Sequence, residues 1–96
     1  MPAYVIALEV IEDREEFDRY RAGVHDILKK YNGEIIVSSE DFEVVEGEWP
    51  YTKTVVIRFP SVEDAKRWYE APEYQEVAKH RFRSTKTDLI FIEGRQ

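Results

Sequence analysis

The stretch YEAPEYQEVAKHRFR, residues 69–83, gathers side chains that are suited to chemistry. It holds two of the six tyrosines of the chain, one of its two histidines and two arginines. Histidine exchanges protons near neutral pH, and an arginine guanidinium binds a carboxylate or an enolate through paired hydrogen bonds. The stretch is therefore either the wall of a binding site or the basic end of a packing helix.

Pro72 favours a separate short helix or a kinked continuation of the preceding one, because proline fits the first helical turn but not the helix interior. We predict this helix over residues 72–82. At about 100° per residue, one sector of it, about 60° wide, is mostly apolar. The sector comprises Tyr74, Val77, Ala78 and Arg81, and His80 lies outside it. Arg81 is thus predicted on the inward face of the helix.

Two interpretations of Arg81 stay open. In the first, its aliphatic stem packs while the guanidinium reaches solvent or pairs with an internal carboxylate, Glu9 or Glu93. In the second, the guanidinium points into a mostly apolar cavity and binds the carboxylate or enolate of a small ligand. A paired carboxylate without an adjacent cavity would favour the first, and an adjacent polar base would favour the second.

We predict a pocket in each subunit between the helices and the sheet. Its predicted lining is Tyr20, His25, Trp49, Tyr69, Tyr74 and Arg81. Arg81 would stabilise negative charge there, with His25 or His80 as the base. His25 also fits a structural or solvent-exposed role, because it lies at the edge of the apolar stripe of its helix. Trp49, in a loop, covers either a pocket rim or a partner subunit.

Several classes of site lack support in the sequence. Two histidines without cysteine, and without a His-x-x-x-His or Glu-x-x-His spacing, predict no metal site. The chain has no nucleophile elbow, phosphate-binding loop or dinucleotide fingerprint, so we expect no cofactor. The sequence does not decide whether the protein is an enzyme.

Length and charge limit the kinds of partner. The 96 residues, with a mass of 11.4 kDa, predict one domain over residues 1–96. Twenty acidic against fourteen basic side chains give a formal net charge of -6, so we expect neither nucleic acid nor an anionic membrane surface as a partner. The chain has no basic leader and no apolar run of about 20 residues, which predicts a cytoplasmic protein.

The elements that must position these residues follow from hydrophobic periodicity. Strands are predicted over residues 3–11, 34–39, 54–59 and 87–93. Helices are predicted over residues 14–31 behind Asp13, after Ser61, and over residues 72–82. The order β-α-β-β-α-β is that of an α+β, ferredoxin-like fold, in which the helices cover one face of an antiparallel sheet.

Both faces of this sheet are predicted to be buried, because apolar residues follow one another along the first and last strands without polar alternation. The helices cover one face only. A second copy of the chain, packed sheet against sheet, would cover the other face and give a homodimer. Glu9 and Arg58 are predicted on this dimer-facing side, where they would pair.

Four stretches resemble the domain-of-unknown-function family 1330 (DUF1330): KYNGEIIV, EGEWP, IRFPSVEDAKRWYEAPEYQEVAKHR and DLIFIEG. The similarity covers nearly the whole chain, with Asn32 where the family usually has glycine and Ala71 where it usually has serine. The resemblance implies a dimeric α+β barrel, a superfamily that also contains cofactor-free monooxygenases, haem-degrading enzymes and lactone isomerases. Cofactor-independent oxygenation and proton transfer both fit that superfamily.

Two functions from different classes follow. In the first, the protein binds or converts a small apolar carbonyl or carboxylate compound in the pocket between helices and sheet. In the second, it is a homodimeric binding or interaction module without chemistry, whose aromatic residues belong to the core.

Overall fold

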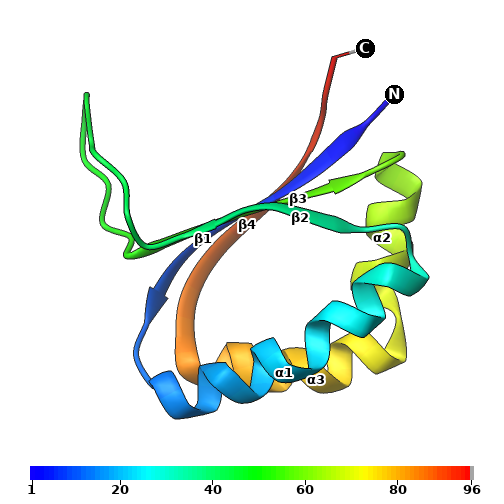
Figure 1. The fold of residues 1–96 in the computed structure, drawn as a ribbon, viewed down its shortest axis with the longest axis horizontal. Coiled ribbons are helices and arrows are strands. Elements are labelled where there is room, and N and C mark those ends of the chain that lie inside the picture. The colour runs from blue at the N-terminus through cyan, green and yellow to red at the C-terminus, as the bar shows by residue number, and fades with distance from the viewer. Residues whose placement is uncertain (96) are drawn as a thin grey trace.

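The computed structural model describes residues 1–95, in which helices cover one face of a four-stranded antiparallel sheet (Figure 1). The strands are β1 (Ala3–Ile11), β2 (Glu34–Ser39), β3 (Lys53–Phe59) and β4 (Thr85–Glu93). The helices are α1 (Arg14–Lys30), α2 (Val62–Glu70) and α3 (Pro72–Ser84). The sheet order β2-β3-β1-β4 confirms the predicted α+β, ferredoxin-like fold.

The helices begin at the predicted capping residues. A carboxylate oxygen of Asp13 accepts a hydrogen bond from the backbone N–H of Glu16 at 3.2 Å, and the Ser61 hydroxyl accepts one from Asp64 at 3.1 Å. Each bond satisfies a backbone donor that has no partner within the first helical turn. Asn32, after α1, has a φ of 65°, a left-handed conformation that commonly ends a helix and that asparagine tolerates. These local signals fix where α1 and α2 start.

Helix α3 is a separate helix that begins at Pro72, and it passes directly into β4. The sequence predicted a connection over residues 83–86, which the structure replaces with helix up to Ser84 and strand from Thr85. The Thr85 hydroxyl donates to the backbone carbonyl of Arg81 at 2.8 Å. This bond satisfies a carbonyl of the last helical turn, so the chain needs no loop to leave the helix.

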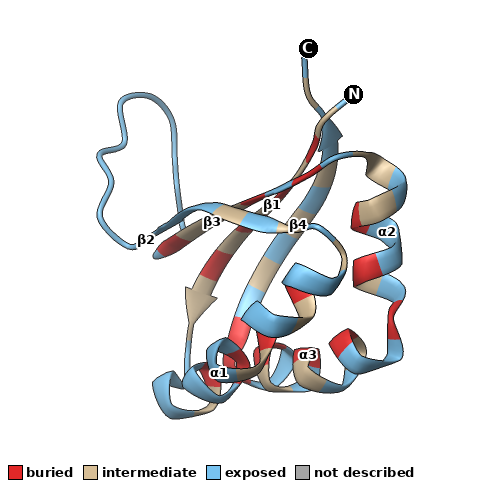
Figure 2. Cartoon of the chain, turned by 45° about the vertical axis from the view of Figure 1, so that its right-hand side comes forward, coloured by how far each residue is buried: buried red, intermediate tan, exposed pale blue. Residues whose placement is uncertain are grey.

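The two faces of β1 have different surroundings. Ala3, Val5, Ala7 and Glu9 are buried on the face that the helices cover. Buried and half-buried positions alternate along β1 in Figure 2. Glu9 lies opposite Lys53 of β3 and opposite Thr87 of β4. The predicted position of Glu9 on the dimer-facing side is therefore wrong, and Arg58 lies exposed on the other face. Both faces of β1 are apolar, so the sequence pattern could not tell which face the helices cover.

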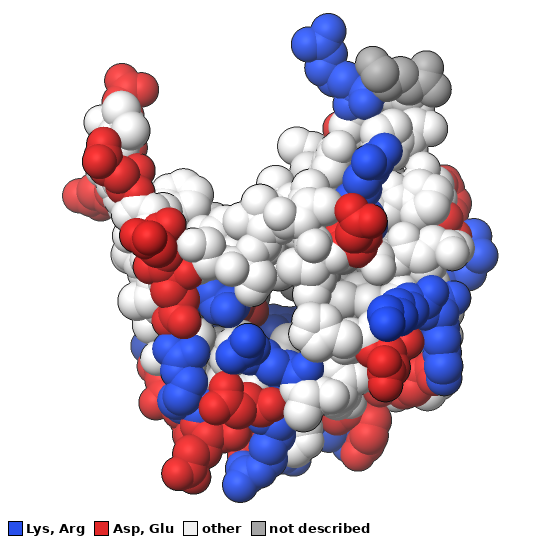
Figure 3. Space-filling view, in the orientation of Figure 1, with Lys and Arg blue, Asp and Glu red and all other residues white. Residues whose placement is uncertain are grey.

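The uncovered face of the sheet and the loop between β2 and β3 expose apolar side chains. We call this loop, residues 40–52, the arm; it projects from the sheet in Figure 1 and is strongly acidic in Figure 3. The large apolar residues exposed on the sheet and the arm are Ile36, Val37, Phe42, Val44, Val45, Trp49, Ile90 and Ile92. Within residues 1–95, no helix is long and apolar enough to cross a membrane.

Candidate functional site

A cavity of about 340 Å³ lies between α1 and the helix-facing side of the sheet, and we call it the inner cavity. Its walls are mostly apolar, with contributions from β1, β3, α1 and Trp68 of α2. The charged residues among its lining are one anion, Glu9, and three cations, Arg21, Lys53 and Arg81. Figure 3 shows a hollow below the sheet bordered by basic side chains, although the chain as a whole carries a formal charge of -6. The local field therefore favours an anionic ligand.

Three of these charged side chains are buried deeply. The exposed fractions are 2% for Glu9, 5% for Lys53 and 4% for Arg81. Within residues 1–95, three buried polar atoms lack a hydrogen-bond partner: Glu9 Oε1, Trp68 Nε1 and Arg81 Nε. All three belong to residues that line the inner cavity. Buried polar groups are nearly always hydrogen-bonded, so these three atoms are donors and acceptors available to a group that enters the inner cavity.

The buried charges of the inner cavity act on one another. Burial raises the pKa of the Glu9 carboxyl above its ordinary value, although the positive charges of Arg81 and Lys53 act in the opposite direction. Burial also disfavours the charged form of Arg81, but the neighbouring Tyr74, Tyr20 and Glu9 outweigh it and raise the pKa of Arg81. Arg81 thus keeps its positive charge, while Glu9 is a stronger base than an exposed glutamate.

The raised pKa of Glu9 makes stability depend on pH. Protonated Glu9 favours the folded state. Its contribution to the free energy of unfolding is fully present below the ordinary pKa of about 4.3, and it is lost as the pH rises through the higher pKa of the folded state. Glu9→Gln keeps the shape and removes the charge. We expect it to match the wild type near pH 4 and to have a higher free energy of unfolding than the wild type at pH 8.

Urea unfolding of the wild type and of Glu9→Gln at both pH values measures this difference. The exposed Glu93 provides the control, because Glu93→Gln removes an equal charge from solvent. A Glu9→Gln variant that is less stable than the wild type at pH 8 would show that the pairing with Arg81 and Lys53 outweighs the cost of burial.

Two tyrosines support Arg81 from the helix side. The hydroxyls of Tyr20 on α1 and Tyr74 on α3 lie 2.9 Å apart and share a buried hydrogen bond. Burial raises the pKa of both hydroxyls, so both stay neutral at physiological pH. The guanidinium carbon of Arg81 lies 5.8 Å from the Tyr20 ring centroid, within reach of a cation–π interaction. Helices α1 and α3 thereby hold Arg81 against the cavity.

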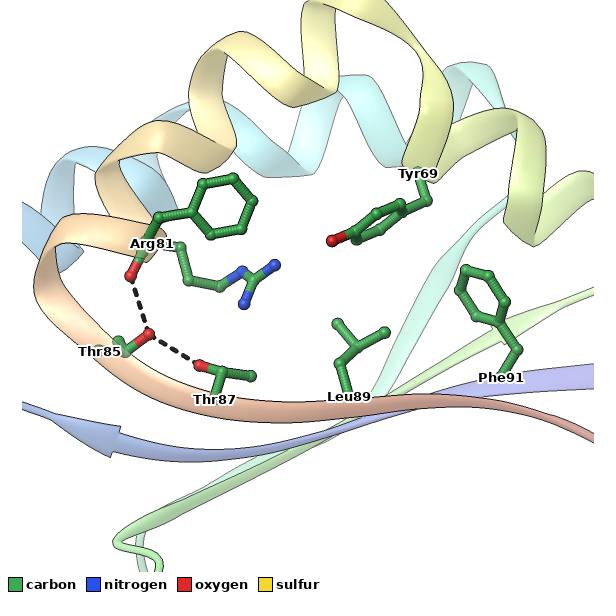
Figure 4. A pocket seen from close by; sticks show the side chains of 7 residues that line it. Tyr69, Arg81, Thr85, Thr87, Leu89 and Phe91 are labelled. Carbon is green, nitrogen blue, oxygen red and sulfur yellow. Dashed lines mark hydrogen bonds between the residues drawn. The ribbon is translucent and has the colours of Figure 1, made fainter.

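A second, more open cavity of about 540 Å³ lies between α3 and β4, and we call it the outer cavity. Its lining is Tyr69, Arg81, Phe82, Thr85, Thr87, Leu89 and Phe91 (Figure 4). Arg81 and Leu89 also line the inner cavity. In Figure 4 the Arg81 guanidinium extends over the sheet, and the Tyr69 hydroxyl points into the same space. Arg81 is therefore the charged residue at the junction of the two cavities.

The structure brings together some of the residues predicted to form the site. Tyr20 and Arg81 line the inner cavity, with the exposed His25 also in its lining, and Tyr69 lines the outer cavity. Tyr74 is fully buried behind them, where it packs on Trp68 with ring centroids 4.1 Å apart. Tyr74 thus supports the site through its hydroxyl and lines neither cavity.

The other two predicted residues lie elsewhere. Trp49 is on the arm, with its ring centroid 5.6 Å from that of Tyr51, and it is 41% exposed. His80 is half-buried on α3 and its Nδ1 pairs with the carboxylate of Glu16 on α1. Neither residue lines the inner or the outer cavity. The predicted role of His80 as a base beside Arg81 therefore has no geometric support.

Sequence reasoning missed Lys53 as a site residue, and it named Glu9 only as a possible counter-ion of Arg81 or a partner of Arg58. Each is a single charge at the end of an alternating apolar stripe, Glu9 on β1 and Lys53 on β3. A lone charge in line with a core-facing stripe is a signal of a buried functional group. Within residues 1–95, no group of three or more His, Cys, Asp and Glu side chains is arranged to hold a metal ion.

The family model described as Domain of unknown function (DUF1330) matches residues 2–95 of the chain. No match is found among curated proteins. Among solved structures, a protein of unknown function from Rhodopseudomonas palustris is similar, with a TM-score of 0.81. The two sequences are 16% identical, and the alignment covers 99% of this chain and 83% of that chain.

Two further structures are similar over nearly their whole length. SnoaB, a cofactor-independent oxygenase from Streptomyces nogalater, has a TM-score of 0.69 and 12% identity, with 99% of this chain and 94% of that chain covered. A dimeric ferredoxin-like protein of unknown function from Jannaschia sp. has a TM-score of 0.68 and 15% identity, with 98% of this chain and 100% of that chain covered. At these identities the similarity establishes the fold and no activity.

Proposed function

The chain belongs to the DUF1330 family, and from this premise we propose that it binds a small organic anion in the inner cavity, with Arg81 holding the anionic group. One observation carries the proposal: the buried polar atoms without a partner, on Glu9, Trp68 and Arg81, all belong to residues of this cavity. A ligand with an acceptor for Arg81 and a donor for Glu9 would satisfy both charged groups.

The dimensions and chemistry of the inner cavity narrow the ligand class. Its volume of about 340 Å³ lies at the small end of the range for ligand sites, roughly 300–1,000 Å³, which suits one ring with a short side chain. The apolar walls suit the ring, and three cations against one anion suit a carboxylate or an enolate. The outer cavity provides the route by which the ligand reaches Arg81.

A pair of matched compounds tests the proposal. 3-Phenylpropanoate and its neutral amide have the same shape and differ only in charge. Titrated into ¹⁵N-labelled protein, the carboxylate is expected to bind at least tenfold more tightly and to shift the amide resonances of β1, β3 and α3 around the inner cavity. Equal affinity for the amide, or shifts confined to the arm, would contradict the proposal. Native mass spectrometry of the purified protein would detect a retained ligand.

The second candidate function, a homodimeric interaction module, is favoured by the apolar side chains on the uncovered sheet face. We place a second copy of the chain there, and the dimeric neighbour from Jannaschia sp. supports that assignment. Dimerisation and ligand binding are compatible, because the inner cavity is on the opposite side of the sheet. If no small anion binds, the homodimeric interaction module becomes the better-supported function.

The cytoplasmic location of the protein remains a prediction.

A further inference from the structure

We infer that Glu9 is a proton-transfer group, acting on the carbon next to the carbonyl of a small ketone or 2-oxo acid whose oxygen is held by Arg81. This inference rests on the proposed function and extends it from binding to chemistry. Three features of Glu9 support it: the rigid position of its backbone, the absence of a direct ion pair to its carboxylate, and the two cations nearby.

The backbone of Glu9 is fixed on both sides. It lies on β1, a central strand of the sheet, opposite Lys53 on one neighbour and Thr87 on the other. Its carbonyl accepts a hydrogen bond from the backbone N–H of Thr52 at 2.8 Å. A side chain on such a rigid element is delivered to one position, which proton transfer to a bound carbon requires.

The Glu9 carboxylate feels the charges of Arg81 and Lys53 but forms no direct ion pair with either. Within residues 1–95, neither Lys53 nor Arg81 approaches it closely enough for an ion pair, and its Oε1 has no hydrogen-bond partner. The Lys53 ammonium lies 5.5 Å from the Phe17 ring centroid, and the Arg81 guanidinium lies 4.9 Å from that of Phe82. The cations therefore interact with aromatic rings and not directly with Glu9, so their charges are available to a ligand oxygen.

The proton transfer is balanced without a further reactant. The C3–H bond of a bound 2-oxo acid breaks, and the proton goes to the Glu9 carboxylate. The electron pair of that bond forms the C2–C3 double bond, while the π pair of the carbonyl moves onto its oxygen beside Arg81. Reversal returns a proton, or a deuteron from D₂O, to C3. Nothing is oxidised or reduced, and the guanidinium stabilises the enolate oxygen as its charge develops.

Deuterium exchange tests this step directly. Phenylpyruvate is mixed with the protein in D₂O, and loss of its C3 proton signal is followed by NMR against the rate in buffer alone. We expect the wild type to accelerate exchange, and Glu9→Gln to lower the protein-dependent rate by about 100-fold or more. Glu9→Asp, which keeps a carboxylate but moves it by one methylene, should retain an intermediate rate.

The pH dependence of the exchange rate distinguishes a role of Glu9 as a base from a purely structural role. The groups around Glu9 are Lys53 from β3, Arg81 from α3, Tyr20 from α1 and Glu40 from the arm. Of these, only Glu9 and Glu40 are carboxylates, but His25 and Arg21 of α1 line the same cavity. The wild-type rate should rise with pH through the titration of Glu9 and keep that rise in Glu40→Gln and in His25→Gln. A profile that follows Glu40 instead would overturn the inference.

Binding of 3-phenylpropanoate distinguishes the two proposals, because this compound lacks the ketone and cannot enolise. If it binds and phenylpyruvate exchange stays at the buffer rate, the role of Glu9 is wrong and the proposed function stands. If neither compound binds, both fail. Exchange that is equal in the wild type and in a folded Glu9→Gln variant would also overturn the inference.

Discussion

Arg81→Met is expected to weaken binding of 3-phenylpropanoate by about 2–5 kcal/mol, which is roughly 30-fold or more, while the protein stays folded. Arg81 is 4% exposed and lines both cavities, so its guanidinium would meet the ligand carboxylate away from competing water. Methionine keeps an unbranched apolar stem of similar reach, which preserves the packing of α3 against α1. The loss should therefore appear in affinity more than in fold.

The same helix supplies the control. Arg83 is two residues further on, with an exposed side chain and a weak 3.8 Å ion pair to Glu16. Arg83→Met removes an equal charge from the helix end, so a general electrostatic effect would weaken binding equally in both variants. We expect calorimetry to show nearly wild-type affinity for Arg83→Met. If the two variants lose affinity to the same extent, Arg81 does not contact the ligand.

Arg81→Lys refines the interpretation. Lysine keeps the charge but cannot present two parallel donors to a carboxylate. Its ammonium group also stacks less well on the Tyr20 ring than the planar guanidinium does. An intermediate affinity would indicate bidentate recognition, whereas wild-type affinity would indicate that charge alone suffices. Thermal unfolding of all three variants would show whether the fold stays equally stable, since the hydrogen-bonded hydroxyls of Tyr20 and Tyr74 lie beside Arg81.

Much of the fold could be predicted from sequence because its signals are local. The bounds of β1 and β2 agree with the predicted ranges, since β-branched runs end there at polar or turn-forming residues. Asp13 and Ser61 mark helix starts through side-chain bonds that reach only three residues along the chain. Each of these features depends on neighbours in sequence, so no knowledge of the tertiary structure was needed.

The site was harder to predict because it depends on contacts between distant elements. The sequence identified Arg81 through the helical sector that it shares with Tyr74, and the structure buries both residues. Glu9 could not be assigned, because its role depends on which face of β1 the helices cover and on the register with Lys53. The residue type alone makes His80 a candidate base, and only the structure shows its pairing with Glu16.

The uncovered face of the sheet leads to the second large effect, a change of assembly. Ile6 lies on this face at the centre of the sheet, opposite Val56 on β3 and Ile90 on β4. Ile90 is 53% exposed, and Ile6 is partly exposed in the isolated chain, so a charge at position 6 costs little there. In a dimer packed sheet against sheet, the same charge would be buried without a partner, and the twofold symmetry would bury it twice.

We therefore expect Ile6→Glu to be a folded monomer under conditions in which the wild type is a dimer. Two unpaired buried carboxylates cost several kcal/mol each, enough to weaken dimerisation by about three orders of magnitude or more. Sedimentation velocity over a concentration series measures the change. Ala22→Glu adds the same charge to the exposed side of α1 and should leave the dimer intact. A monomeric wild type, or a dimeric Ile6→Glu, would mean that this face is covered by something other than a second copy.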